Sequence, residues 1–188
     1  MSEAASKLIS NTMLLFSSCL GLKTTPRSMG YARCAFKLYT VSSVIGTFSA
    51  LFSSPVLNDL DETIWVWCYC LGIPLLACDL CVLSEYAPDP APLHLAIPLY
   101  TLVSYHYFPE HVDPLLLSIS HSISILFLSV CSACEGHLCG YALAFLHFFT
   151  MWRMDSDEKA HIDWTTHMTM SNFLALNVIE WIIEEKRE

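Results

Sequence analysis

Long apolar blocks separated by short polar breaks dominate the pattern of this chain. A helix needs roughly 20 apolar residues, with a range of about 17–25, to span the hydrocarbon core of a bilayer. Six blocks have such a length: residues 38–57, 64–83, 91–108, 115–134, 136–152 and 164–183. The pattern therefore predicts an all-α fold, a polytopic transmembrane bundle of about six helices, with five to seven as the range.

Two stretches leave the number of crossings open. Residues 164–183 carry two asparagines, a histidine and a glutamate, so this block is either the weakest crossing or an interfacial helix. Residues 8–22 are apolar but short, and they fit a seventh crossing, a signal-peptide core or a membrane-surface helix. A cleavable signal fits poorly, because Glu3 offsets Lys7 and no A-x-A site follows the apolar core.

The composition supports a membrane protein. Charged residues make up only 14% of the 188 residues, against about 25% in a typical soluble domain. No lysine or arginine occurs between Lys37 and Arg153, which a water-facing surface of that length would not allow. We therefore expect an integral, multi-pass protein of the endoplasmic reticulum or plasma membrane, with the lipid bilayer as its main partner.

The basic residues predict an orientation. Four of them lie just before the block 38–57, so the positive-inside rule places residues 1–37 in the cytoplasm, and the charged tail 184–188 follows them there. Six crossings then put three loops on the far side: residues 58–63, 109–113 and 153–163. These loops hold nine acids and two bases, a net charge of −7, which would attract cations and repel nucleic acid. The alternative is that these acids are simply solvated, because acids barely influence topology.

Small residues at a spacing of four predict helix packing. Helices in lipid associate where small side chains let backbones approach and where polar groups meet. One such stripe lies at the end of the first block and another in the fifth: Ser42, Gly46, Ala50 and Ser54, then Gly136, Gly140 and Ala144. His147 falls on the second stripe, and His121 lies on a serine-rich stripe of the fourth block. Together the stripes predict a bundle with a polar interior, and other membrane proteins or further copies of the chain as partners.

Asp79 is the one charged residue in an otherwise apolar block. An acid at the centre of a membrane helix costs about 2.5–3.5 kcal/mol, so Asp79 should face the interior and be paired or protonated. Its expected partner is a hydroxyl or a histidine at similar depth, with His94 and His137 as the candidates. Gly72 and Pro74 precede it and would kink the helix, which frees backbone carbonyls.

No cofactor is predicted. The pairs Cys78-x-x-Cys81 and Cys131-x-x-Cys134 have zinc-like spacing, but they lie in or beside apolar blocks, where cysteine is a common small buried residue. The weak candidates for a metal site are His161, Asp163 and His167, since imidazole and carboxylate suit zinc, manganese or iron. No HExxH motif is present, and an aspartate that caps a helix explains part of this pattern.

Three classes of function remain. The favoured one is a non-enzymatic membrane assembly, scaffold or accessory protein, because small-residue faces and short loops are present while P-loop, dinucleotide-binding and GxSxG motifs are absent. The first alternative is a small transporter or channel subunit for protons, cations or a small solute. The second is an intramembrane lipid or isoprenoid enzyme, in which Asp79 is the general acid and His94 or His137 the base.

Overall fold

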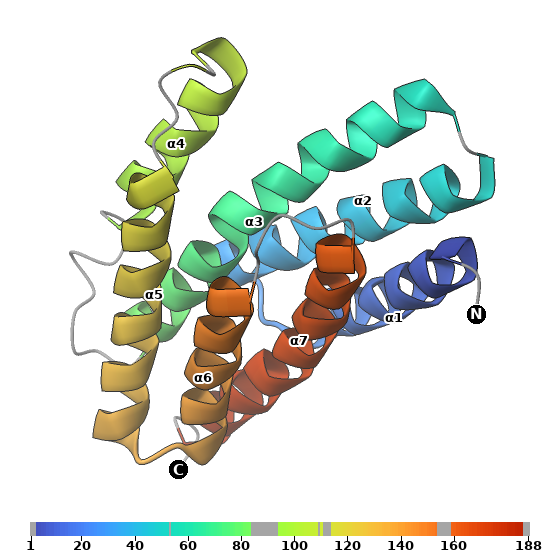
Figure 1. Cartoon of the computed structure of the whole chain (residues 1–188). Helices are drawn as coiled ribbons and strands as arrows, with labels where there is room; N and C mark the ends of the chain where they lie inside the picture. The colour runs from blue at the N-terminus through green and yellow to red at the C-terminus, as the bar shows by residue number, and fades with distance from the viewer. Residues whose placement is uncertain are drawn as a thin grey trace.

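The computed structural model describes residues 3–52, 54–83, 94–108, 110, 114–153 and 159–185. Within these ranges the chain forms helices and no strand, which confirms the predicted all-α fold (Figure 1). The helices are α1 (Glu3–Thr24), α2 (Gly30–Phe52), α3 (Pro55–Leu83), α4 (Ala96–Tyr107), α5 (Pro114–Glu135), α6 (Leu138–Arg153) and α7 (Lys159–Glu185).

Six of the helices pack in a ring. Each of α1, α2, α3, α5, α6 and α7 contacts the next, and α7 returns to pack against α1. Helix α4 lies outside this ring, against α3 and α5. Figure 1 shows α2 and α3 as an antiparallel pair, with α6 and α7 as a second pair in front of them. The side chains that point into the ring therefore come from segments far apart in the sequence.

Helix α3 contains a long run of buried residues. Every residue from 71 to 80 is buried, because α2, α4, α5 and α7 all pack against α3. A helix that is apolar on all sides is typical of such a position. Asp79 lies within this stretch, so the structure must satisfy its carboxylate inside the protein.

Three described helices are long and apolar enough to cross a membrane. They comprise Gly30–Phe52, Pro55–Leu80 and Ser118–Glu135, with mean hydropathies of 1.3, 1.6 and 1.3. The apolar part of α6, Leu138–Thr150, is shorter. Helix α4 has 12 residues, about 18 Å at 1.5 Å per residue, which is less than the roughly 30 Å of a bilayer core. Three of the six predicted crossings are thus both long enough and apolar enough to span a membrane.

The loop predicted at residues 58–63 is wrong. These residues form the first turns of α3, which begins at Pro55, whereas α2 ends at Phe52. Pro55 starts α3, where its missing N–H and fixed backbone angle are favourable. Asp59, Asp61 and Glu62 follow within the first two turns of α3, although the first turn itself holds no acid. These acids therefore belong to a helix and not to a loop.

Residues 8–22 belong to α1, which runs antiparallel along α2. Near one end, a methyl group built on Gly46 would lie 2.6 Å from Asn11 Oδ1, so the two helices are in close contact there. Near the other end, a methyl group on Gly21 would lie 2.6 Å from the Phe36 ring. Helix α1 therefore follows most of the length of α2.

An ion pair corrects the predicted sidedness. Lys7 Nζ lies 2.7 Å from Asp61 Oδ2 and donates a hydrogen bond to Ser49 Oγ at 3.1 Å. Ser49 Oγ in turn donates to Asn58 Oδ1 at 2.7 Å. The sequence placed Lys7 in the cytoplasm and Asp61 on the far side, and this contact shows that both placements cannot hold. The reason is that α1 returns to the end of α2 opposite the basic cluster.

Gly46→Leu should separate α1 from α2. The larger side chain would overlap Asn11, and overpacking of this kind costs about 1–3 kcal/mol of unfolding free energy. Gly30→Leu is the matched control, because a side chain built on Gly30 meets nothing within 4 Å. Unfolding of both variants and the parent in detergent micelles provides the measurement. Equal losses of unfolding free energy in the two variants would contradict close packing at Gly46.

Candidate functional site

Asp79 closes the N-terminus of a neighbouring helix. Its Oδ2 accepts a hydrogen bond from the backbone N–H of Ala32 at 2.6 Å, and the backbone N–H of Tyr31 donates to the same carboxylate. These are the second and third residues of α2, whose first N–H groups have no partner within the helix. Met29, just before the helix, has no oxygen in its side chain. Asp79 supplies from α3 the contact that a serine or aspartate at the N-cap would usually make.

Arg33 caps the C-terminal end of α1, the helix that precedes the same turn. Arg33 Nη1 donates to the carbonyl oxygens of Leu22 at 2.8 Å and Thr25 at 2.7 Å, at the C-terminal end of α1. The two side chains match the helix dipoles, with an anion at an N-terminus and a cation at a C-terminus. Residues 25–29 are thus fixed from both sides.

The hydrogen bonds of Asp79 go to the α2 backbone, whereas the sequence predicted a histidine or a hydroxyl as its partner. His94 packs on Phe127 with 4.7 Å between ring centroids, and within the described part of the chain its Nε2 has no hydrogen-bond partner. His137 accepts a hydrogen bond from the Gly140 N–H at 3.2 Å through Nδ1. The antiparallel pairing of α2 and α3 brings the start of α2 to the carboxylate instead.

The small residues predicted to pack have different roles. Ser42 and Gly46 are buried, whereas Ala50 is half-buried and Ser54 lies at the turn before α3. In the second stripe, Ala144 is buried, and a methyl group on Gly140 would overlap Ser132 Oγ of α5.

Gly136 forms a turn and not a packing face. Its φ is +66°, a left-handed conformation that favours glycine. The Gly136 N–H donates to the Ala133 carbonyl at 3.3 Å, and the His137 N–H donates to the Ser132 carbonyl at 3.0 Å. This pair of bonds is the Schellman motif, which ends α5 and lets α6 return beside it.

A set of polar contacts joins helices of the ring near the middle of the bundle, and we call this set the polar belt. Asn172 Nδ2 donates to the hydroxyl oxygens of Ser17 and Ser18 at 3.0 Å each. Ser171 Oγ is hydrogen-bonded to His147 Nε2 at 2.8 Å. His121 Nε2 is hydrogen-bonded to the Tyr69 carbonyl oxygen at 2.9 Å. Ser42 of α2 also bonds to Cys68 of α3. Tyr69 lies ten residues from Asp79, about 15 Å along α3. The belt has members on all six helices of the ring, and its hydrogen bonds pair polar groups that cannot reach water.

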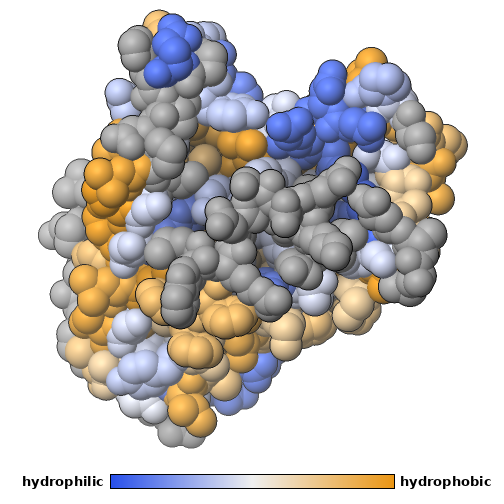
Figure 2. Space-filling model, in the orientation of Figure 1, coloured by the Kyte–Doolittle hydropathy of each residue, from blue (hydrophilic) through white to orange (hydrophobic). Residues whose placement is uncertain are grey.

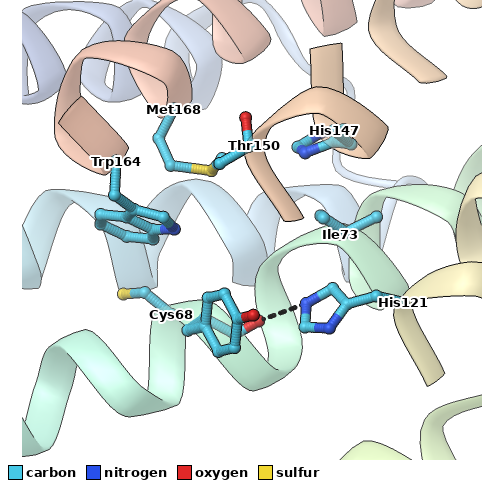
Figure 3. A pocket seen from close by; sticks show the side chains of 8 residues that line it. Cys68, Ile73, His121, His147, Thr150, Trp164 and Met168 are labelled. Atoms are coloured by element: carbon cyan, nitrogen blue, oxygen red, sulfur yellow. Dashed lines mark hydrogen bonds between the residues drawn. The ribbon is translucent and has the colours of Figure 1, made fainter. Parts of the chain in front are cut away.

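A small cavity lies within the polar belt (Figure 3). Its volume is about 10 Å³, and it borders side chains from α3, α5, α6 and α7: Cys68, Tyr69, Ile73, His121, His147, Thr150, Trp164 and Met168. His147 is fully buried beside it. This cavity and its two histidines form the candidate functional site.

The sequence reading missed Asn172 as a buried residue. Its polarity counted against a crossing at 164–183, yet its side chain is fully buried. The signal was the helical period, because Trp164, Met168, Ala175 and Ile179 of α7 are all buried and Asn172 falls on their stripe.

The predicted metal candidates lie only in part within the described side chains. Among the residues that the structure describes, no group of three or more His, Cys, Asp or Glu side chains could hold a metal ion. The side chains of His161 and Asp163 lie outside the described set. His167 packs near Phe149, with 6.2 Å between ring centroids.

No protein-family model, curated protein or solved structure matches this chain. The class of this protein is therefore defined by its fold and its candidate site alone. It is an all-α bundle in which three helices are apolar enough to cross a membrane, with hydrogen-bonded polar side chains between the helices.

Asp79→Ala should lower the unfolding free energy by about 1–3 kcal/mol, because the start of α2 loses its charged acceptor. Asp79→Asn keeps one acceptor oxygen and should lose less. Asp59→Asn, an exposed acid of the same helix, is the control and should change stability by less than about 0.5 kcal/mol. Unfolding in detergent micelles ranks the variants, and an Asp79→Ala protein as stable as the parent would refute the cap.

Proposed function

We propose that this chain is a multi-pass integral membrane protein that acts as an assembly, scaffold or accessory protein. Its partners are the lipid bilayer and the helices of other membrane proteins or of further copies of itself. The membrane is the endoplasmic reticulum or the plasma membrane, as the composition predicts. The observation that carries the proposal is the polarity of the bundle, which is apolar outside and unusually polar inside.

Large apolar side chains point outward from the helices of the ring. Leu138 is 80% exposed, Phe145 69% and Phe16 64%. Figure 2 shows hydrophobic residues over the flank that α5 forms and over the lower end of the molecule, with hydrophilic residues gathered near the upper ends of α3 and α4. Exposed apolar patches of this size mark a surface that contacts lipid or protein.

Polar side chains gather where the helices meet. The buried set includes serines, threonines, histidines and asparagine, among them Ser17, Ser43, Ser124, His121, His147, Thr165, Ser171 and Asn172. Hydrogen bonds between helices supply specificity in lipid, where burial of apolar surface gives little drive for association. This arrangement supports a bundle held together by the polar belt.

Two cavities that the described residues line are too small for a substrate. The cavity in the polar belt has a volume of about 10 Å³, and a second one beside Glu135 and Trp181 has about 20 Å³. Small-molecule sites usually measure about 300–1,000 Å³. The acid–base enzyme is also less well supported, because Asp79 caps α2 and meets neither His94 nor His137.

The transporter hypothesis remains the second candidate. Pro74 lies inside α3, where it removes one hydrogen bond of the helix, and His121 bonds to the Tyr69 carbonyl one turn earlier. Ionisable side chains at the centre of a bundle and interrupted helices recur in transport pathways. This hypothesis expects a proton or cation flux in proteoliposomes that His147→Phe abolishes.

The N-terminus and the turn that joins α2 to α3 should lie on the same side of the membrane. Helix α1 runs antiparallel to α2, and Lys7 meets Ser49 near the end of α2. Glycosylation sequons with short spacers, placed before residue 3 and in this turn, should both be modified or both remain unmodified in a gel-shift assay. Modification of only one would place α1 elsewhere than beside α2 in the membrane.

A photo-crosslinker at position 145 should capture a defined protein band in native membranes. Phe145 is exposed on α6, whereas Phe36 is fully buried, so the same probe at position 36 is the control and should give only internal crosslinks. Crosslinks to lipid alone from positions 145 and 16 would contradict an accessory role and favour the transporter candidate.

A further inference from the structure

The cavity in the polar belt has room for one water molecule. A cavity needs about 10–15 Å³ of this kind of volume to hold a water, and the water needs two to four polar partners. At about 10 Å³ this cavity lies at that limit and excludes anything larger. Its occupant is therefore decided by which hydrogen-bonding groups border it.

His147 contributes an acceptor. Its Nε2 pairs with Ser171 Oγ, which does not line the cavity, so the remaining ring nitrogen is Nδ1. Nδ1 is buried, and no described residue gives it a hydrogen bond. A neutral imidazole has one N–H and one acceptor nitrogen. If Nε2–H donates to Ser171, Nδ1 is left as an acceptor inside the protein, which is costly unless a donor reaches it.

Trp164 contributes a donor. The indole N–H can only donate, and Figure 3 shows the indole nitrogen turned toward the space between Trp164 and His147. Met168 lies between them, and its thioether sulfur is a weak acceptor. A donor and an acceptor thus face one space that is too small for an organic ligand.

We propose that a single water molecule occupies this cavity, accepts a hydrogen bond from Trp164 Nε1–H and donates one to His147 Nδ1. Its second O–H faces the Met168 sulfur. The water links the start of α7 to α6 and gives the polar belt a partner for His147 Nδ1. It also fixes the tautomer of His147, with the proton on Nε2 and directed at Ser171.

The inference does not depend on the proposed function, because it concerns only the interior of the fold. A crystal structure of the full chain grown in a lipid mesophase should show a solvent peak about 2.7–3.2 Å from both His147 Nδ1 and Trp164 Nε1. An empty cavity, or a peak that reaches neither nitrogen, would overturn the proposal.

Nitrogen NMR of the ¹⁵N-histidine protein gives a second test. In the parent, His147 should carry its proton on Nε2, with Nδ1 in the range of a hydrogen-bonded acceptor. Trp164→Phe removes the donor that holds the water, so the Nδ1 resonance should move toward that of a free acceptor. Trp181→Phe, on the same helix but outside this cavity, is the matched control and should leave it unchanged. An Nδ1 resonance unaffected by Trp164→Phe, or a proton on Nδ1 in the parent, would refute the bridge.

Discussion

The start of α2 packs against Asp79 of α3, and the rest of the bundle depends on how the free N–H groups of this helix end are satisfied. Asp79 of α3 accepts two of these groups, while Arg33 of α2 closes the end of α1. Each contact joins two neighbouring helices at one level. Because the Lys7–Asp61 ion pair joins α1 to α3 at the opposite end, the first three helices are held in register at both ends.

The second half of the ring is joined to this unit through the polar belt. His121 reaches a backbone carbonyl of α3, and Asn172 reaches two serines of α1. These contacts have fixed geometry, whereas apolar packing between helices gives little preference for one register in a lipid environment. The belt therefore decides how α5, α6 and α7 are placed on the first three helices.

Charged residues that resemble parts of a catalytic or binding site have structural roles in this protein. Asp61 of α3 pairs with Lys7 of α1, and Asp79 caps the N-terminus of α2. Both roles use the carboxylate as a fixed hydrogen-bond acceptor or anion. The candidate functional groups are instead the neutral side chains of the interior, above all His147. Its second ring nitrogen borders the cavity between α6 and α7.

The sequence by itself determined the all-α class, the positions of most helices and the need to satisfy Asp79, because block length and polarity are local properties of the chain. The helical period of α7 also contained the signal that Asn172 is buried, although its polarity counts against a crossing. Only the tertiary structure decided that the partner of Asp79 is the α2 backbone, that α1 returns along α2, and that His121 and His147 share one level. Backbone N–H groups are the same in every residue and leave no trace in the sequence, so a cap supplied by another helix can be recognised only when the two helices are packed together.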